Sequence, residues 1–269
     1  MERPVGTRGE IGLVPWSTAG IRDYWLGGSH HTVADHEVAE RILRGAPHLG
    51  HVVRVYRSVL GRVVRCLVGV GVRQFLDLGS GLPTAGNVHE VAQELDSGCR
   101  VVYVDIDPGV VAESRELLAG NRDAAIVHAD FRQPEQVFDA IGRCGLLDLG
   151  APVAVLAIDV LHHIPDTDDP VRLIQDYVDA VCPGSYVIVA HTSDGDALVS
   201  GLAMFHRFYQ IPVPPLTFRN MVQSEDFFTG LDLVSPGIVP IPLWRPEEDE
   251  DVDTDVDYFP AWCGLGQKP

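Results

Sequence analysis

Cysteine is scarce in this sequence, and the few that occur are too scattered to build a site. The five residues form no Cys-x-x-Cys pair and are odd in number: Cys66, Cys99, Cys144, Cys182 and Cys263. Such a set is typical of reduced thiols and not of a disulfide framework or a zinc site. We therefore expect a cytoplasmic protein. The adjacent pairs His30-His31 and His162-His163 have no carboxylate to complete a ligand set, so no metal ligand is expected.

Basic residues and long apolar runs are also scarce. The 20 Lys and Arg residues face 38 Asp and Glu residues, which gives a net charge of −18. Surfaces that bind phosphates need a basic footprint, so neither a nucleic acid nor an anionic membrane is an expected partner. The longest apolar run, residues 153–158, is too short to cross a bilayer, and residues 1–16 lack the apolar segment of a signal peptide.

The first third of the chain has the periodicity of amphipathic helices. Thr32 and Asp35 have the spacing of a capping box ahead of an apolar face, and apolar residues recur at helical spacing through residues 51–68. We predict an N-terminal helical extension or lid over residues 1–70. Residues 71–269 are then predicted to form the main domain.

From residue 73 onward, short apolar runs alternate with helix-starting signals. The runs are RQFLDL, CRVVYVDID, AAIVHAD, PVAVLAID and SYVIVAH. Helix starts are predicted at Asn87, Asp107-Pro108, Pro134 and Asp169-Pro170. Unbroken apolar strands between helices are typical of a parallel sheet covered on both faces, so the fold class is a doubly wound α/β sheet. After the sheet, helices are expected over residues 197–210 and around 219–228, then an acidic loop over 247–257 and a final strand.

The turn after the first strand is rich in glycine. Asp77 precedes Gly79 and Gly81, whose missing side chains let the backbone turn sharply and approach a ligand. A dinucleotide fingerprint needs a third glycine where Thr84 stands, and Pro83 removes an N–H donor that a pyrophosphate would use. The turn therefore favours a nucleoside ligand without phosphates, and Asp77 suits an ammonium group.

Two further strands end in an acidic residue. Asp105 ends the second strand, where a carboxylate can accept hydrogen bonds from both ribose hydroxyls. Asp130 ends the third strand and can accept from an adenine amino group, beside the aromatic ring of Phe131. The carboxyl ends of parallel strands meet at one edge of the sheet. Together these residues predict an adenosine site.

Several stretches of the chain resemble a bacterial family of S-adenosylmethionine-dependent methyltransferases, known chiefly from actinobacteria and long catalogued as a domain of unknown function. The matching stretches are DYWLGG, RQFLDLGSGLPTAGNVHEVAQ, VVYVDIDP, HADFRQP, VLHHIPD, PGSYVIVAH and FRNMVQSEDFFTGLDLVSPGIVPIPLWRP. The resemblance spans about residues 21–269. The chain departs from the usual family pattern at residues 29–32, and Tyr56 stands where the family favours Asn.

The resemblance implies a class I, Rossmann-like methyltransferase fold with seven strands, the last inserted antiparallel. It also implies S-adenosyl-L-methionine as the cofactor and cofactor-binding roles for Asp77, Gly79, Gly81, Asp105, Asp130 and Phe131. The expected activity is methyl transfer to an unidentified, small-molecule acceptor. A catalytically silent protein that binds the same cofactor is the alternative, and a nicotinamide oxidoreductase is disfavoured by Pro83 and Thr84.

The end of the fourth strand and the segment before the helices supply further candidates. His162 is the candidate general base, because it follows the strand end next to which a transferred methyl would lie. Asp159 is a candidate for the methionine ammonium group. Tyr24 and Gly28 belong to an aromatic and glycine-rich segment that either closes over the cofactor or packs as a hydrophobic staple on the second helix.

Overall fold

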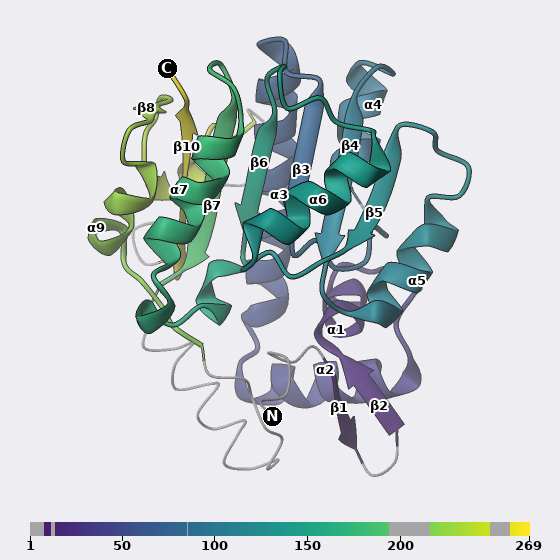
Figure 1. Cartoon of the computed structure of the whole chain (residues 1–269). Helices are drawn as coiled ribbons and strands as arrows, with labels where there is room; N and C mark the ends of the chain where they lie inside the picture. Colours follow the sequence, from purple (N-terminus) through teal and green to yellow (C-terminus); the bar gives the residue numbers. More distant parts are fainter. Residues whose placement is uncertain (1–7, 12–13, 85, 194–215, 248–258) are drawn as a thin grey trace.

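A mostly parallel sheet forms the centre of the molecule in the computed structural model, which describes residues 8–11, 14–84, 86–193, 216–247 and 259–269 (Figure 1). The strand order is β5-β4-β3-β6-β7-β10-β8, and β9 also pairs with β10. The parallel strands are β3 (Gln74–Leu78), β4 (Arg100–Asp105), β5 (Ala124–His128), β6 (Ala154–Ile158) and β7 (Tyr186–Thr192). The antiparallel part consists of β10 (Ala261–Gln267), β8 (Asp232–Leu233) and β9 (Val239–Pro240). The predicted doubly wound sheet with an antiparallel last strand is confirmed, and β9 is a two-residue addition to the seven expected strands.

The helices that follow the strands begin where the sequence signals predict. They are α4 (Val88–Leu95), α5 (Pro108–Leu117), α6 (Pro134–Cys144) and α7 (Pro170–Ala180). Asn87 and Glu90 form a capping box at α4, and the Asp107 side chain accepts from the amides of Gly109 and Val110 at α5. These side chains satisfy N–H groups that a helix start leaves without partners.

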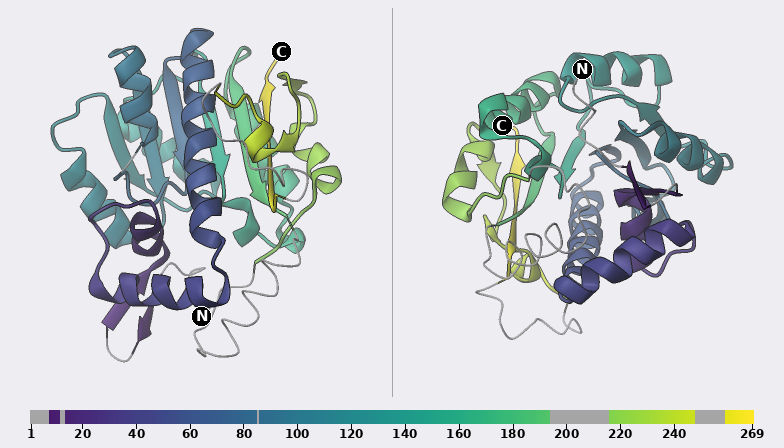
Figure 2. Two further views of the ribbon diagram at one scale, coloured as in Figure 1. Left: turned by 180° about the vertical axis from the view of Figure 1, so that it is seen from behind. Right: turned by 90° about the horizontal axis from the view of Figure 1, so that it is seen from below.

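Helices cover both faces of the sheet, as the two further views show (Figure 2). Because successive strand residues point to opposite faces, Phe75 and Val101 pack in one core with α3 (Leu49–Gly69), α4 and α5. Leu76 and Val102 pack in the second core with α6 and α7. All four of these side chains are fully buried, and burial on both faces explains why the strands are unbroken apolar runs.

The N-terminal region contains a hairpin and a helix that sequence periodicity did not reveal. The hairpin is β1 (Arg8–Ile11) with β2 (Val14–Ser17), and the helix is α1 (Thr18–Trp25). The predicted capping box of Thr32 and Asp35 starts α2 (Val33–Gly45). In Figure 1, α1 and α2 lie below the sheet, at the end where its parallel strands finish.

The predicted N-terminal extension has two structural parts. The long helix α3 packs directly on the sheet and belongs to its core. Trp16, α1 and α2 form a small cluster of their own, whose buried members are Trp16, Ile21, Ala34, Val38 and Ala39. A domain boundary at residue 70 stays a prediction.

The C-terminal part agrees with the sequence where it is described. The short helix α9 (Met221–Ser224) continues into a 3-10 turn at Glu225–Phe228, and β10 is the predicted final strand. The predicted helix over residues 197–210 and most of the acidic run over 247–257 lie outside the described residues. Within the described part, no helix has both the length and the apolar character needed to span a membrane.

Candidate active site

A cavity of about 330 Å³ lies at the carboxyl ends of β3, β4 and β6. This volume is within the range of small-molecule sites, roughly 300–1,000 Å³. Strand β3 lies between β4 and β6, so the strand order reverses there, which is where doubly wound sheets bind ligands. Residues of α1, α2 and α3 complete the wall on the other side.

The cavity brings together most of the residues predicted from the sequence. Its wall includes Asp77, Gly79, Gly81, Asp105, Asp130, Phe131, Asp159 and His162. Tyr24 and Gly28 are not among the described residues that line it.

The glycine turn has the conformation that its sequence requires. Gly79 and Gly81 both have a φ of 64°, which is strained for residues with a side chain. A Cβ on Gly79 would come within 2.7 Å of Val160 Cγ1. Glycine at position 79 therefore lets the loop after β6 pack against the first turn, and the backbone itself forms this part of the cavity wall.

The carboxylates of Asp77 and Asp105 lie in different environments. Burial raises the pKa of Asp77 to about 7, with the charge of Asp105 adding to it and that of Arg57 opposing it. Asp105 Oδ2 accepts from the Gly81 amide at 2.9 Å, and Oδ1 accepts from the Asp107 amide at 2.8 Å. Asp105 therefore fixes both the glycine turn and the start of α5, in addition to facing the cavity.

Asp130 and Phe131 lie at one end of the cavity. The Arg132 side chain donates to both oxygens of Asp130, with Nε 2.9 Å from each and Nη2 2.6 Å from Oδ2. The Phe131 carbonyl accepts from Tyr177 Oη at 2.7 Å, which ties the loop to α7. The contacts with Arg132 therefore fix the orientation of the Asp130 carboxylate.

Three side chains contact the Asp159 carboxylate, those of Arg22, His162 and Thr192. It follows β6 with a φ of 55°, and its side chain forms an ion pair with Arg22 of α1. Oδ1 accepts from Thr192 Oγ1 at 3.0 Å, and Thr192 contacts Tyr56 Oη at 2.9 Å. Burial alone would raise the pKa of Asp159, but the charges of Arg22 and His162 outweigh it and hold this pKa well below its usual range. Asp159 is therefore an anion at neutral pH.

His162 lies between Asp159 and a second histidine. Its Nδ1 is 3.3 Å from Asp159 Oδ1, and its Nε2 is 3.1 Å from His163 Nε2. Burial, together with the positive charge of His162, lowers the pKa of His163 to about 3. His163 is consequently uncharged at neutral pH.

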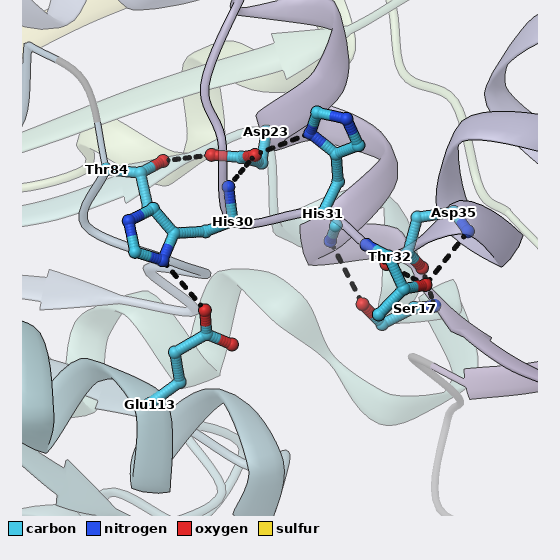
Figure 3. A network of polar contacts seen from close by, with 9 residues as sticks. Ser17, Asp23, His30, His31, Thr32, Asp35, Thr84 and Glu113 are labelled. Carbon is cyan, nitrogen blue, oxygen red and sulfur yellow. Dashed lines mark hydrogen bonds and ion pairs between the residues drawn. The ribbon is translucent and has the colours of Figure 1, made fainter.

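The buried carboxylate of Asp23 connects the segment after α1 to the glycine-rich turn after β3 (Figure 3). Asp23 accepts from Thr84 Oγ1 at 2.5 Å, from the His30 amide at 2.8 Å and from His31 Nδ1 at 3.0 Å. His30 Nδ1 lies 3.0 Å from Glu113 of α5. These contacts connect residues 23–31 to the glycine-rich turn and to α5, so the segment forms one edge of the site.

Tyr24 and Gly28 belong to this segment but have other partners. Tyr24 Oη donates to Glu40 Oε1 at 2.6 Å, and its ring lies 4.4 Å from that of His36, so it packs on α2. A Cβ on Gly28 would meet Asp23 Oδ1 at 2.0 Å. Within residues 24–28, the neighbours Trp25 and Leu26 line the cavity. Contact of Tyr24 or Gly28 with a cofactor stays a prediction.

Comparison with known proteins decides the family. The family model described as S-adenosyl methyltransferase matches residues 10–269. The chain belongs to this family. It is therefore an S-adenosylmethionine-dependent methyltransferase, as its sequence resemblance implied.

Solved structures agree with this assignment. A DUF574 family protein from Streptomyces avermitilis has 33% identity and a TM-score of 0.85, covering 94% of this chain and 98% of that one. A putative methyltransferase from Thermobifida fusca has 36% identity and a TM-score of 0.83, covering 94% and 95%. The mitomycin 7-O-methyltransferase shares only the fold, with 19% identity, a TM-score of 0.51 and coverage of 80% and 54%. No curated protein matches the chain.

The lining of the cavity of this methyltransferase fits S-adenosylmethionine in its chemistry. Five aspartates, Asp23, Asp77, Asp105, Asp130 and Asp159, lie on the described wall, and carboxylates suit a ligand that carries a sulfonium and an ammonium and has no phosphate.

Sequence reasoning missed several residues of the site. Arg22 and Thr192 contact Asp159, and Tyr56 contacts Thr192, so that three elements far apart in the chain meet here. No local motif predicts such contacts, because Arg22 and Asp159 are 137 positions apart in the sequence. The isolated arginine among the apolar residues of α1 was the available signal.

Proposed function

We propose that this methyltransferase acts on a small, largely apolar acceptor and that His162 accepts the acceptor's proton. Methyl transfer is an in-line displacement, so orientation of the acceptor in a dry pocket contributes much of the rate. S-adenosylmethionine supplies an electrophilic methyl group on its sulfonium. The scattered, free cysteines support a cytoplasmic setting.

The contact between His162 and Asp159 carries the proposal. Asp159 Oδ1 lies 3.3 Å from Nδ1, so this carboxylate can orient the imidazole ring. Burial and the charge of His162 lower the pKa of His163 to about 3, which makes His163 the poorer base. His162 is therefore the candidate base of the pair for an acidic hydroxyl of the acceptor.

The wall formed by the N-terminal helices supports an apolar acceptor. On that side the cavity is lined mainly by aromatic and aliphatic side chains, namely Trp16, Ile21, Trp25, Leu26, Ile42, Leu49, Val52, Val53, Tyr56 and Leu60. Desolvating a charged acceptor against such a wall is costly. This favours a neutral ring or chain that carries one reactive heteroatom.

The cofactor contacts predicted from the sequence are part of the same proposal. Asp105 accepts from the ribose hydroxyls, while Asp130 and Phe131 hold the adenine ring. Asp77 and the backbone of the glycine turn lie along the methionine portion. Their common position on the cavity wall supports these roles.

Labelled methyl transfer into a metabolite extract tests the acceptor class. Enzyme and S-adenosylmethionine with a labelled methyl group are incubated with an extract of Streptomyces avermitilis, the source of a relative, and the products are separated by size. We expect label in the small-molecule fraction. Label confined to protein or nucleic acid would contradict the proposal, and the absence of any transfer would favour a silent cofactor-binding protein.

Two matched variants test the base. His162→Asn should lower the rate by about 10²–10⁴-fold, the usual worth of a general base, with the affinity for S-adenosylhomocysteine within about twofold of wild type. His163→Asn should have a much smaller effect on the rate. Equal losses of rate in both variants would contradict the assignment of His162 as the base.

A further inference from the structure

The ion pair between Arg22 and Asp159 lies at the wall of the cavity, where a ligand can reach it. Arg22 comes from α1 and Asp159 from the end of β6, and both line the cavity. The side chain of Arg22 is 37% exposed, whereas that of Asp159 is 8% exposed. The carboxylate is therefore fixed, and the guanidinium is the accessible partner.

Arg22 has hydrogen-bonding capacity to spare. A guanidinium carries five N–H donors, and Nη1 of Arg22 donates to Asp159. Within the described residues, its other N–H groups have no protein acceptor. These donors suit a second carboxylate, since guanidinium groups bind carboxylates through pairs of parallel hydrogen bonds.

The other two arginines of the wall have other partners. Arg132 donates to both oxygens of Asp130, and Arg57 Nη1 donates to Asn87 Oδ1 at 2.8 Å. Among the described arginines that line the cavity, Arg22 is the one that is paired with Asp159.

Charge complementarity at Asp159 favours such an anion. The Arg22 guanidinium already faces its carboxylate. An ammonium group bound there would place a second positive charge beside that guanidinium. A carboxylate carried by the same ligand and placed on Arg22 restores the alternation of charges. The pair is thus complementary to a zwitterionic amino acid.

We propose that Arg22 and Asp159 form the amino-acid subsite of the cofactor site, in which Arg22 binds the α-carboxylate and Asp159 the α-ammonium group of the methionine portion. Arg22 then makes α1 part of the cofactor site. This inference rests on the family's cofactor and not on the proposed acceptor or base, so it stands if either of those fails.

A thermodynamic cycle between the protein and the ligand tests the subsite. Calorimetry gives the Kd values of S-adenosylhomocysteine, of its decarboxylated analogue and of 5′-methylthioadenosine, which lacks the amino-acid portion. Wild type should bind S-adenosylhomocysteine about 10- to 100-fold more tightly than the decarboxylated analogue, the usual worth of hydrogen bonds between charged groups. In Arg22→Met this preference should fall below about twofold, with the Kd of 5′-methylthioadenosine unchanged.

Arg44→Met is the matched control. Arg44 is an exposed arginine of α2 outside the cavity wall, so its loss changes net charge equally and should leave the preference intact. Arg22→Gln is measured alongside, because it can still donate to Asp159 and preserves the packing of α1 if the Met variant does not fold. Wild type that binds both ligands equally, or Arg22 variants that retain the preference, would overturn the proposal. An Arg22 variant that loses activity but keeps these Kd values would overturn the subsite and would point to a role of Arg22 in the acceptor chemistry.

Discussion

Removal of the Asp105 carboxylate should weaken both the fold and the cofactor site. The side chain is only 7% exposed and accepts two backbone hydrogen bonds, from the amides of Gly81 and Asp107. Asp105→Ala leaves both amides without this acceptor. The glycine turn and the start of α5 lose a common anchor.

The size of the effect follows from these contacts. A hydrogen bond to a charged group contributes about 1.5–3 kcal/mol, and the two bonds share one carboxylate, so the free energy of unfolding should fall by roughly 3–5 kcal/mol. For a chain of this size, 1 kcal/mol shifts the Tm by roughly 2–4 °C. The Tm should therefore fall by about 10 °C. The affinity for S-adenosylhomocysteine should fall by about 10- to 100-fold when the predicted ribose contacts are also lost.

Thermal unfolding and calorimetry measure the two effects separately. Asp107→Ala is the control, because Asp107 caps α5 next to Asp105 without lining the cavity. Its loss should lower the free energy of unfolding by the smaller amount expected of a helix cap, about 0.5–2 kcal/mol, and leave the affinity within about twofold of wild type. A wild-type Tm in Asp105→Ala would refute the anchoring role. An unchanged affinity for S-adenosylhomocysteine would show that Asp105 does not bind the ribose.

Two further predictions concern pH and closure of the site. Because the pKa of Asp77 is about 7 in the fold and near 4 when unfolded, the native state keeps a proton between these values that the unfolded chain has released. The free energy of unfolding of wild type, measured by denaturant titration relative to Asp77→Asn, should therefore fall by about 1.4 kcal/mol per pH unit from about pH 4 to 7, and parallel curves would contradict the burial of Asp77. If residues 24–28 close over the cofactor, their amides should gain hydrogen-exchange protection on addition of S-adenosylhomocysteine, whereas equal protection with and without ligand would favour the predicted hydrophobic staple on the second helix, α3.

Local chemistry allowed much of the main domain to be predicted. Asn87 with Glu90 and Thr32 with Asp35 start helices at the expected residues, because capping depends on side chains within one turn. The strands were recognisable because a sheet covered on both faces requires unbroken apolar runs. The hairpin of β1 and β2 and the short helix α1 were missed, since neither is long enough to show a clear period.

The sequence by itself determined the strand-end positions Asp77, Asp105, Asp130 and Asp159, because the end of a parallel strand fixes on which edge of the sheet a residue lies. Only the tertiary structure decided what each carboxylate contacts. Asp130 faces a neighbour two residues away, whereas Asp159 meets Arg22 from α1. Such pairings depend on how distant elements pack, and no spacing within the chain encodes them. The sequence therefore located the cofactor site, and the packing of α1 against the end of β6 decided its charge pattern.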